Sequence, residues 1–260
     1  MSEEVLVRDV ERHREITINR PKRRNALTVE VVDALVAAVR GAEAAGVRSI
    51  VLTGTPPAFC AGGDLPSLSA LAAQGSAVAT DAIYTSFHGL VRALRDSPLP
   101  VIAAVSGPAF GAGLDLALCC DLRIAAPDAL FESTWIKAGL VPGMGGAHHL
   151  AALVGGARAA QMLLLGQRLD AASALACGLV GEVAEGDLAA RAAEVAETLA
   201  DLPELALART KASLRRYLHQ GLDGELAVMG AQQGQLLVGE EFLEATARLT
   251  RRGPAPAGTE

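Results

Sequence analysis

Two glycine-rich segments are places where backbone amides could act on a bound carbonyl group. They are Phe59-Cys-Ala-Gly-Gly-Asp-Leu65 and Phe110-Gly-Ala-Gly-Leu-Asp115, and each lies between an apolar run typical of a buried strand and a segment with helical character. Glycine lets a backbone approach a ligand closely, and the first N–H groups of a helix have no partner within the helix. Two such amides suit a carbonyl oxygen that gains negative charge. Taken alone, either segment also fits a tight connection without chemistry.

Other glycine-based motifs are absent from the sequence. A dinucleotide fingerprint starting at Gly111 would need glycine at position 116, which is Leu116. The sequence contains neither a GxxxxGK[ST] phosphate loop nor a GxSxG nucleophile elbow. The sequence therefore does not support nucleotide binding or serine-hydrolase chemistry at the two turns.

Composition restricts the class of protein. The 260 residues are 51% hydrophobic, 20% charged and 3% aromatic, with a net charge of −6, which argues against a nucleic-acid partner. The first ten residues lack a signal-peptide pattern, and no apolar stretch reaches the roughly 18 residues of a membrane span, so we expect a cytoplasmic protein. The four cysteines fit a reducing compartment, and their spacing predicts no metal site.

Apolar runs alternate with helical patterns over the first part of the chain. We expect strands at 5–10, 15–19, 49–53, 101–105, 122–125 and 129–131, with a helix capped by Thr28 and another over about 77–96. Such alternation predicts an α/β fold whose strands are buried on both faces.

From about Gly143 helical patterns dominate, apart from a short strand expected at 180–183. Helices are predicted over 188–199, 203–219, 222–238 and 240–250. We therefore divide the chain into an α/β core, residues 1–195, and a helical region, residues 196–260, that packs on a neighbouring subunit or covers a ligand site.

Six segments in order resemble one family. They are Asn19-Arg-Pro-Lys-Arg-Arg-Asn-Ala-Leu27, Ala58-Phe-Cys-Ala-Gly-Gly-Asp-Leu65, Pro100-Val-Ile-Ala-Ala-Val-Ser-Gly107, Ala109-Phe-Gly-Ala-Gly-Leu-Asp-Leu116, Cys120-Asp-Leu-Arg123 and Gly139-Leu-Val-Pro-Gly-Met-Gly-Gly146, followed by a tail over 240–254. The chain resembles the enoyl-CoA hydratase/isomerase family, the crotonase superfamily, over about residues 5–254. The resemblance implies a crotonase-like ββα spiral core with a C-terminal helical region.

The resemblance also implies a ligand and a way of holding it. Family members bind acyl-CoA thioesters and stabilise an enolate-like anion with two backbone amides, which fall here at Gly63 and Ala112. Lys22 and Arg24 would lie near the phosphates of CoA, although a solvated surface turn is an equal alternative. The backbone at Ala26, Ala61, Asp64 and Leu65 would frame adenine and pantetheine. No cofactor is implied beyond the coenzyme A of the substrate.

The acid/base residues depart from the family pattern. Hydratases of the family use two glutamates, and the first of these positions is Asp115 in this chain, a carboxylate one methylene shorter. The second position is Trp135, so this carboxylate is missing. Glu132 would substitute only if the local backbone differs from that of the family.

Trp135 and His88 also resemble positions of aryl-CoA dehalogenases in the same superfamily. The nucleophilic aspartate of those enzymes would fall at Gly143, so the resemblance does not extend to covalent dehalogenation. The two side chains would fit an aromatic or bulky acyl group. Alternatively, Trp135 fills the core, His88 is an ordinary polar residue of its helix, and Asp64 stabilises a turn.

Two functions remain open from the sequence. The first is an acyl-CoA enzyme of hydratase/isomerase type in which Asp115 is the main acid/base, with one-base isomerisation favoured over hydration. The second is a non-catalytic acyl-CoA-binding protein on the same scaffold, because Trp135 replaces a glutamate. The family further implies a homotrimer or hexamer, and we expect neither nucleic-acid nor membrane partners.

Overall fold

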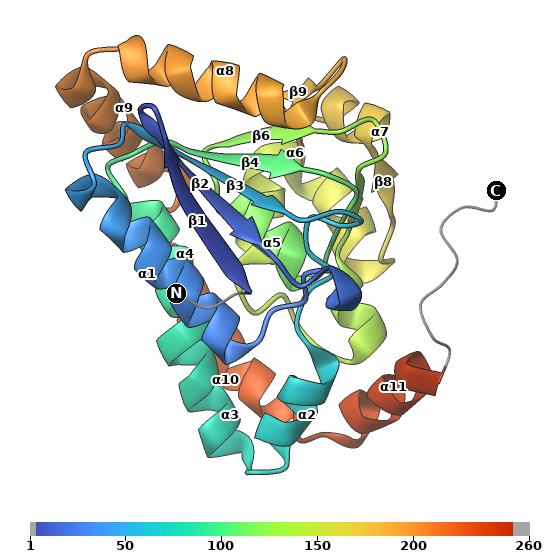
Figure 1. Cartoon of the computed structure of the whole chain (residues 1–260). Coiled ribbons are helices and arrows are strands. Elements are labelled where there is room, and N and C mark those ends of the chain that lie inside the picture. The colour runs from blue at the N-terminus through green and yellow to red at the C-terminus, as the bar shows by residue number, and fades with distance from the viewer. Residues whose placement is uncertain (1–3, 252–260) are drawn as a thin grey trace.

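A computed structural model describes residues 4–251, which form two β-sheets surrounded by helices (Figure 1). The larger sheet has the order β1-β2-β3-β4-β6-β9, and the smaller has the order β5-β7-β8. The strands are β1 (Val5–Val10), β2 (His13–Ile18), β3 (Ser49–Gly54), β4 (Val101–Val105), β5 (Pro108–Phe110), β6 (Leu122–Ala125), β7 (Leu130–Glu132), β8 (Leu169–Asp170) and β9 (Glu182–Val183). β1 and β2 pair antiparallel, and every further pair in the large sheet is parallel.

The central strands of the large sheet are buried on both faces. All five residues of β4 are buried, as expected for a parallel strand that reads as a continuous apolar run. Helix α8 (Leu188–Asp201) runs across β2, β3, β4 and β6 (Figure 1). Its Ala192 and Ala196 pack against Val51 and Ile102 on one face, while the main core fills the other. The predicted α/β fold is confirmed.

The helices mostly follow the apolar stripes of the sequence. They are α1 (Val29–Ala44), α2 (Leu65–Ala72), α3 (Ser76–Ala82), α4 (His88–Asp96), α5 (Ala112–Leu118), α6 (Gly146–Leu164), α7 (Ala171–Ala176), α9 (Glu204–Leu218), α10 (Leu222–Leu236) and α11 (Glu240–Arg251). The shorter helical turns are η1 (Pro21–Arg23), the π-helical η2 (Ile83–Phe87) and η3 (Thr134–Ala138). Thr28 caps α1 as predicted, since its hydroxyl accepts a hydrogen bond from Val31 N.

Three features differ from the sequence-based expectations. The helix expected over 77–96 contains a π-helical turn at 83–87. The long helix α6, with non-helical dihedral angles at Gly155, was not predicted. Of the small sheet only β7 was predicted, as the strand at 129–131, and its partners β5 and β8 were not. The proposed boundary at residue 195 lies within α8, and this division remains a prediction.

Helices α10 and α11 lie at the same end of the molecule as α2 and α3, whereas α8 and α9 lie at the other end (Figure 1). Helix α10 packs on α3 and η2, and α11 packs on η3. The end of the last resembling motif, residues 252–254, lies outside the described residues. Within residues 4–251, the structure contains no helix with the length and apolar character needed to cross a membrane.

Candidate active site

The two glycine-rich turns are joined by backbone hydrogen bonds. Cys60 N donates to Pro108 O at 3.1 Å, and Phe110 N donates to Cys60 O at 2.9 Å. The two turns can approach this closely because residue 113 is glycine, since a Cβ at that position would lie 2.1 Å from Cys60 O. The structure therefore brings together two segments about 50 residues apart, as the oxyanion-hole hypothesis requires.

The amides of Gly63 and Ala112 lie at this junction. Ala112 is the first residue of α5, after Gly111 with φ +51°, and Gly62 has φ +107°. A Cβ on Gly62 would lie 3.5 Å from Ala112 N, which shows how closely the two turns approach. Within residues 4–251, neither Gly63 N nor Ala112 N donates a hydrogen bond to protein. The protein itself therefore leaves the hydrogen-bonding capacity of both amides unused.

Asp115 lies one turn into α5 and is 0% exposed. Its Oδ2 accepts a hydrogen bond from Trp135 Nε1 at 3.1 Å. Burial raises the pKa of Asp115 to about 7, against the smaller opposite effects of the Met144 backbone N–H and the Trp135 indole. A carboxyl group with this pKa can both accept and return a proton near neutral pH.

Trp135 connects Asp115 to an apolar pocket. It lies on η3 and is 8% exposed. The pocket has a volume of about 20 Å³ and is lined by apolar side chains, glycines and one amide: Gly63, Leu68, Ile83, Phe87, Trp135, Gly143, Met144 and Gln233. Asp115 is not among the lining residues and reaches the pocket wall through Trp135.

His88 lies behind the same wall. It is fully buried at the start of α4, and its Nε2 is 2.8 Å from the carbonyl oxygen of Gly143, a lining residue. Burial lowers its pKa, so the imidazole is neutral near pH 7 and Nε2–H donates to that carbonyl. The structure thus places His88 next to the pocket without exposing it there.

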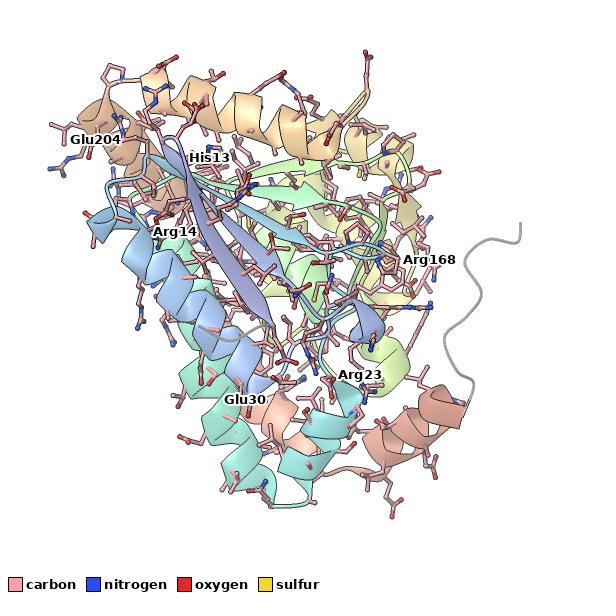
Figure 2. All side chains as sticks on the ribbon, viewed as in Figure 1. His13, Arg14, Arg23, Glu30, Arg168 and Glu204 are labelled. Carbon is pink, nitrogen blue, oxygen red and sulfur yellow. The ribbon has the colours of Figure 1, made fainter. Side chains whose placement is uncertain are left out.

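Glu132 does not supply the missing second carboxylate. Its Oε1 is 2.6 Å from Lys137 Nζ, and its Oε2 is 2.7 Å from Arg168 Nε. The Glu132 side chain is buried, whereas the side chains of Lys137 and Arg168 (labelled in Figure 2) are about half exposed. Both carboxylate oxygens are held by cations, and the pair with Lys137 links β7 to η3.

The cationic loop is attached to the first glycine turn. Ala61 N donates to Arg24 O at 2.9 Å, and Leu27 N donates to Gly62 O at 2.8 Å. Lys22 is exposed, like its neighbour Arg23, which is labelled in Figure 2, and Arg24 is half-buried. The loop therefore brings positive charge to the rim of the site.

The remaining predicted contact residues have identifiable places. Asp64 caps α2 by accepting from Ser67 N, and its Oδ2 is 3.3 Å from Arg20 Nη1, so the turn-stabilising interpretation fits its contacts. Leu65 is half-buried at the start of α2, and Ala26 is buried. Several residues in the site were not predicted: Leu68, Ile83, Phe87 and Gly143 in the pocket wall, and three that matter for the packing, Met144, Gly146 and Gln233.

These three residues shape the surroundings of Asp115. A Cβ on Gly146 would lie 2.1 Å from Asp115 Oδ1, so only glycine leaves room for the carboxyl group. Gln233 Oε1 accepts from Val141 N at 3.1 Å and so ties α10 to the segment before α6. The three glycines among residues 143–146 were the only sequence signal for such close packing.

Comparisons with known proteins agree with this geometry. A family model described as enoyl-CoA hydratase/isomerase matches residues 13–238. A probable enoyl-CoA hydratase of Mycobacterium tuberculosis is 43% identical over 70% of this chain and 71% of its own length. A probable enoyl-CoA hydratase of Rhodobacter capsulatus is 36% identical over 92% of this chain and 91% of its own length. The crystal structure of an enoyl-CoA hydratase/isomerase from Mycobacterium paratuberculosis superposes with a TM-score of 0.90, at 29% identity, over 95% of this chain and 99% of that one.

Proposed function

Because the chain belongs to the enoyl-CoA hydratase/isomerase family, a family of enzymes, we propose that it binds an acyl-CoA thioester at the junction of the two glycine-rich turns. The N–H groups of Gly63 and Ala112 hold the thioester oxygen, and Asp115 moves the proton. The observation that supports this proposal is the pairing of the two turns through Cys60, because it brings the segments that carry both amides side by side.

A single carboxyl group favours isomerisation over hydration. Asp115 would take a proton from C2 of a 3-enoyl thioester, the oxyanion hole would hold the resulting dienolate, and Asp115 would return the proton at C4. Hydration would need a second carboxylate to share the proton of the water. Trp135 occupies the position of that carboxylate, and Glu132 is paired with two cations. A pKa of about 7 suits both halves of the isomerisation.

The loop from Lys22 to Arg24 would receive the phosphates of CoA. Its attachment to the first turn through Ala61 and Leu27 supports this, since the same backbone would then contact adenine, pantetheine and the thioester. Coenzyme A would enter only as part of the substrate, without another cofactor.

A substrate panel with product identification tests the proposal. We expect 3-enoyl-CoA thioesters to be converted to 2-enoyl products faster than 2-enoyl thioesters are hydrated. Asp115→Asn should lower isomerisation by about 10²–10⁴-fold, the usual contribution of a general acid/base. Rapid hydration that is unaffected by Asp115→Asn would refute the role of Asp115.

One observation favours a second candidate function, acyl-CoA binding without turnover. Asp115 is fully buried and does not line the apolar pocket. For a binding protein we expect acyl-CoA to raise the unfolding temperature while none of the tested thioesters is turned over. Measuring crotonyl-CoA hydration, 3-enoyl isomerisation and thermal shift on one preparation separates the two functions.

The proposal includes a cytoplasmic location and a homotrimeric or hexameric assembly. The four cysteines are free thiols, which fits a reducing compartment. The assembly rests on the family alone, and sedimentation of the purified chain would test it.

A further inference from the structure

A second cavity lies at the other end of α5 from the glycine turns. Its volume is about 50 Å³, and its walls come from the end of α5, the first part of α6 and the second half of α9. Its charged and titratable lining consists of Arg95, Cys119, Cys120, Asp121, Arg123, His149, Arg215 and His219. None of its lining residues lines the apolar pocket beside Trp135.

Two arginines of this cavity have no carboxylate partner. Over residues 4–251, neither Arg123 nor Arg215 forms an ion pair, and both guanidinium groups donate only to backbone carbonyls. Arg123 donates from Nε to Leu179 O and from Nη1 to Cys120 O, at 2.8 and 2.7 Å. Removing guanidinium groups from water without an opposite charge is unfavourable, so this cavity favours an anion.

The other charges of the lining are already neutralised. Asp121 Oδ2 is 2.6 Å from Lys211 Nζ and also accepts from Val101 N. Arg95 pairs with the exposed carboxylates of Asp96 and Asp223. The excess positive charge in the cavity therefore comes from Arg123 and Arg215.

Two imidazoles in the wall are kept neutral mainly by burial. The His149 and His219 rings lie 5.2 Å apart between centroids. The pKa of His149 falls to about 3, first by burial, then by the facing His219 and His148, and then by Arg123. Burial also lowers the pKa of His219, with smaller contributions from His148, Arg95 and Arg215 and an opposing one from Asp121. Both rings are neutral near pH 7 and can donate N–H hydrogen bonds without carrying charge.

One nitrogen of this pair has no partner within the described chain. His219 Nδ1 is buried and forms no hydrogen bond with protein. A buried polar atom of this kind normally has a hydrogen-bond partner, and a ligand oxygen would provide one.

We propose that this cavity binds a small oxyanion between Arg123, Arg215 and His219. Guanidinium groups match carboxylate and phosphate oxygens in geometry as well as charge. The volume exceeds the 10–15 Å³ that one water needs, yet it admits only a compact ligand. Inorganic phosphate and the carboxylate of a small organic acid share this chemistry.

The test compares two neighbouring arginines of α9. Arg215 lines the cavity, whereas Arg216 is exposed and does not line it, so Arg215→Gln and Arg216→Gln make the same charge change on the same helix. Each variant and the wild type are titrated with phosphate and with acetate against sodium chloride at equal ionic strength, followed by calorimetry and thermal unfolding. Both variants leave Lys22–Arg24 intact, so phosphate binding at that loop is common to both.

We expect saturable oxyanion binding to the wild type and to Arg216→Gln, with a dissociation constant raised about tenfold or more in Arg215→Gln by loss of one charge-assisted contact. Whether phosphate or acetate binds more tightly identifies the source of the oxyanion. Equal affinities of the two variants, or no binding beyond the chloride effect, would overturn the proposal.

A measurement on the wild type alone keeps the test decisive if Arg215→Gln does not fold. An anion beside His219 stabilises its protonated form, so saturating oxyanion should raise the pKa of His219 measured by imidazole NMR. An unchanged titration of His219 in the presence of both oxyanions would contradict the site.

Discussion

Trp135 links the apolar pocket to the proposed base through one hydrogen bond. Its ring forms part of the pocket wall, while its Nε1 donates to Asp115 Oδ2. This hydrogen bond makes Oδ2 the acceptor, so a protonated Asp115 carries its proton on Oδ1. The residue that removes the second acid thus also orients the first.

Substituting this tryptophan should change the pH dependence of the reaction. The indole lowers the pKa of Asp115, so Trp135→Phe should raise that pKa. The acidic limb of the pH profile of kcat/KM should then move to higher pH by about half to one unit, which corresponds to the free energy of one neutral hydrogen bond. Phe87→Leu alters the same wall away from Asp115 and should change KM without moving that limb. Coincident profiles for wild type and Trp135→Phe would mean that Trp135 only fills the pocket.

The side chains at the site differ in how far the sequence predicts them. The two glycine turns were recognised from residue type and order, and Asp115 from the family resemblance, because each lies in a short run of sequence. The pairing of Glu132 with Lys137 and Arg168 does not follow, since Arg168 lies 36 residues away and meets Glu132 only in the folded chain. The direction of the Trp135 indole likewise depends on where α5 and η3 pack.

Among the secondary-structure elements, α5 has the central place. Its first residue is Ala112, its first turn holds Asp115, and its last residue, Leu118, borders the cavity lined by Arg123 and Arg215. Its close approach to the first glycine turn depends on Gly113, which faces Cys60. Since the interior is tightly packed, a methyl group there must separate the two turns.

Gly113→Ala should therefore destabilise the fold and the site together. We expect a loss of about 1–3 kcal/mol in the free energy of unfolding, typical of overpacking, with a larger loss of activity than of acyl-CoA binding. Gly89→Ala on α4 is the matched control, because no atom lies within 4 Å of its added Cβ, and it should stabilise by about 0.5–1 kcal/mol. Urea unfolding compares them, and a Gly113→Ala protein as stable as wild type would contradict the tight junction.

The strands of the large sheet were easier to predict from the sequence than those of the smaller sheet. Long apolar runs such as β3 and β4 predict buried parallel strands by themselves. The strands β5, β7 and β8 have only two or three residues, so their pairing depends on tertiary contacts rather than on a local pattern. That small sheet nevertheless positions Gly111, whose amide donates to Glu132 O.

At the scale of the whole molecule, burial of Asp115 couples the site to stability. Its pKa is about 7 in the folded chain, against an ordinary value of 3.8, so the folded state binds more protons than the unfolded state between these values. The resulting contribution to stability is complete below about pH 4 and is lost as the pH rises through about 7. The site therefore becomes less stable as its base becomes active.

This coupling predicts a difference between wild type and Asp115→Asn. As the pH rises from 4 to 7, the free energy of unfolding of wild type should fall relative to the variant by up to a few kcal/mol, since each pKa unit is worth about 1.4 kcal/mol. Denaturant unfolding at several pH values measures this difference. Parallel curves for the two proteins would mean that the pKa of Asp115 is ordinary in the folded chain.

The central claim is that one carboxyl group removes a proton from C2 of the thioester while two backbone amides stabilise the resulting enolate. Solvent deuterium exchange at C2 of a 3-enoyl-CoA measures that step directly. Proline fits the first position of a helix, so Ala112→Pro removes a donor N–H where α5 tolerates it. We predict that wild type incorporates deuterium, that Ala112→Pro loses about 10²–10³-fold in rate, and that Asp115→Asn loses exchange while still binding the thioester. Exchange at the wild-type rate in folded Ala112→Pro would contradict the account.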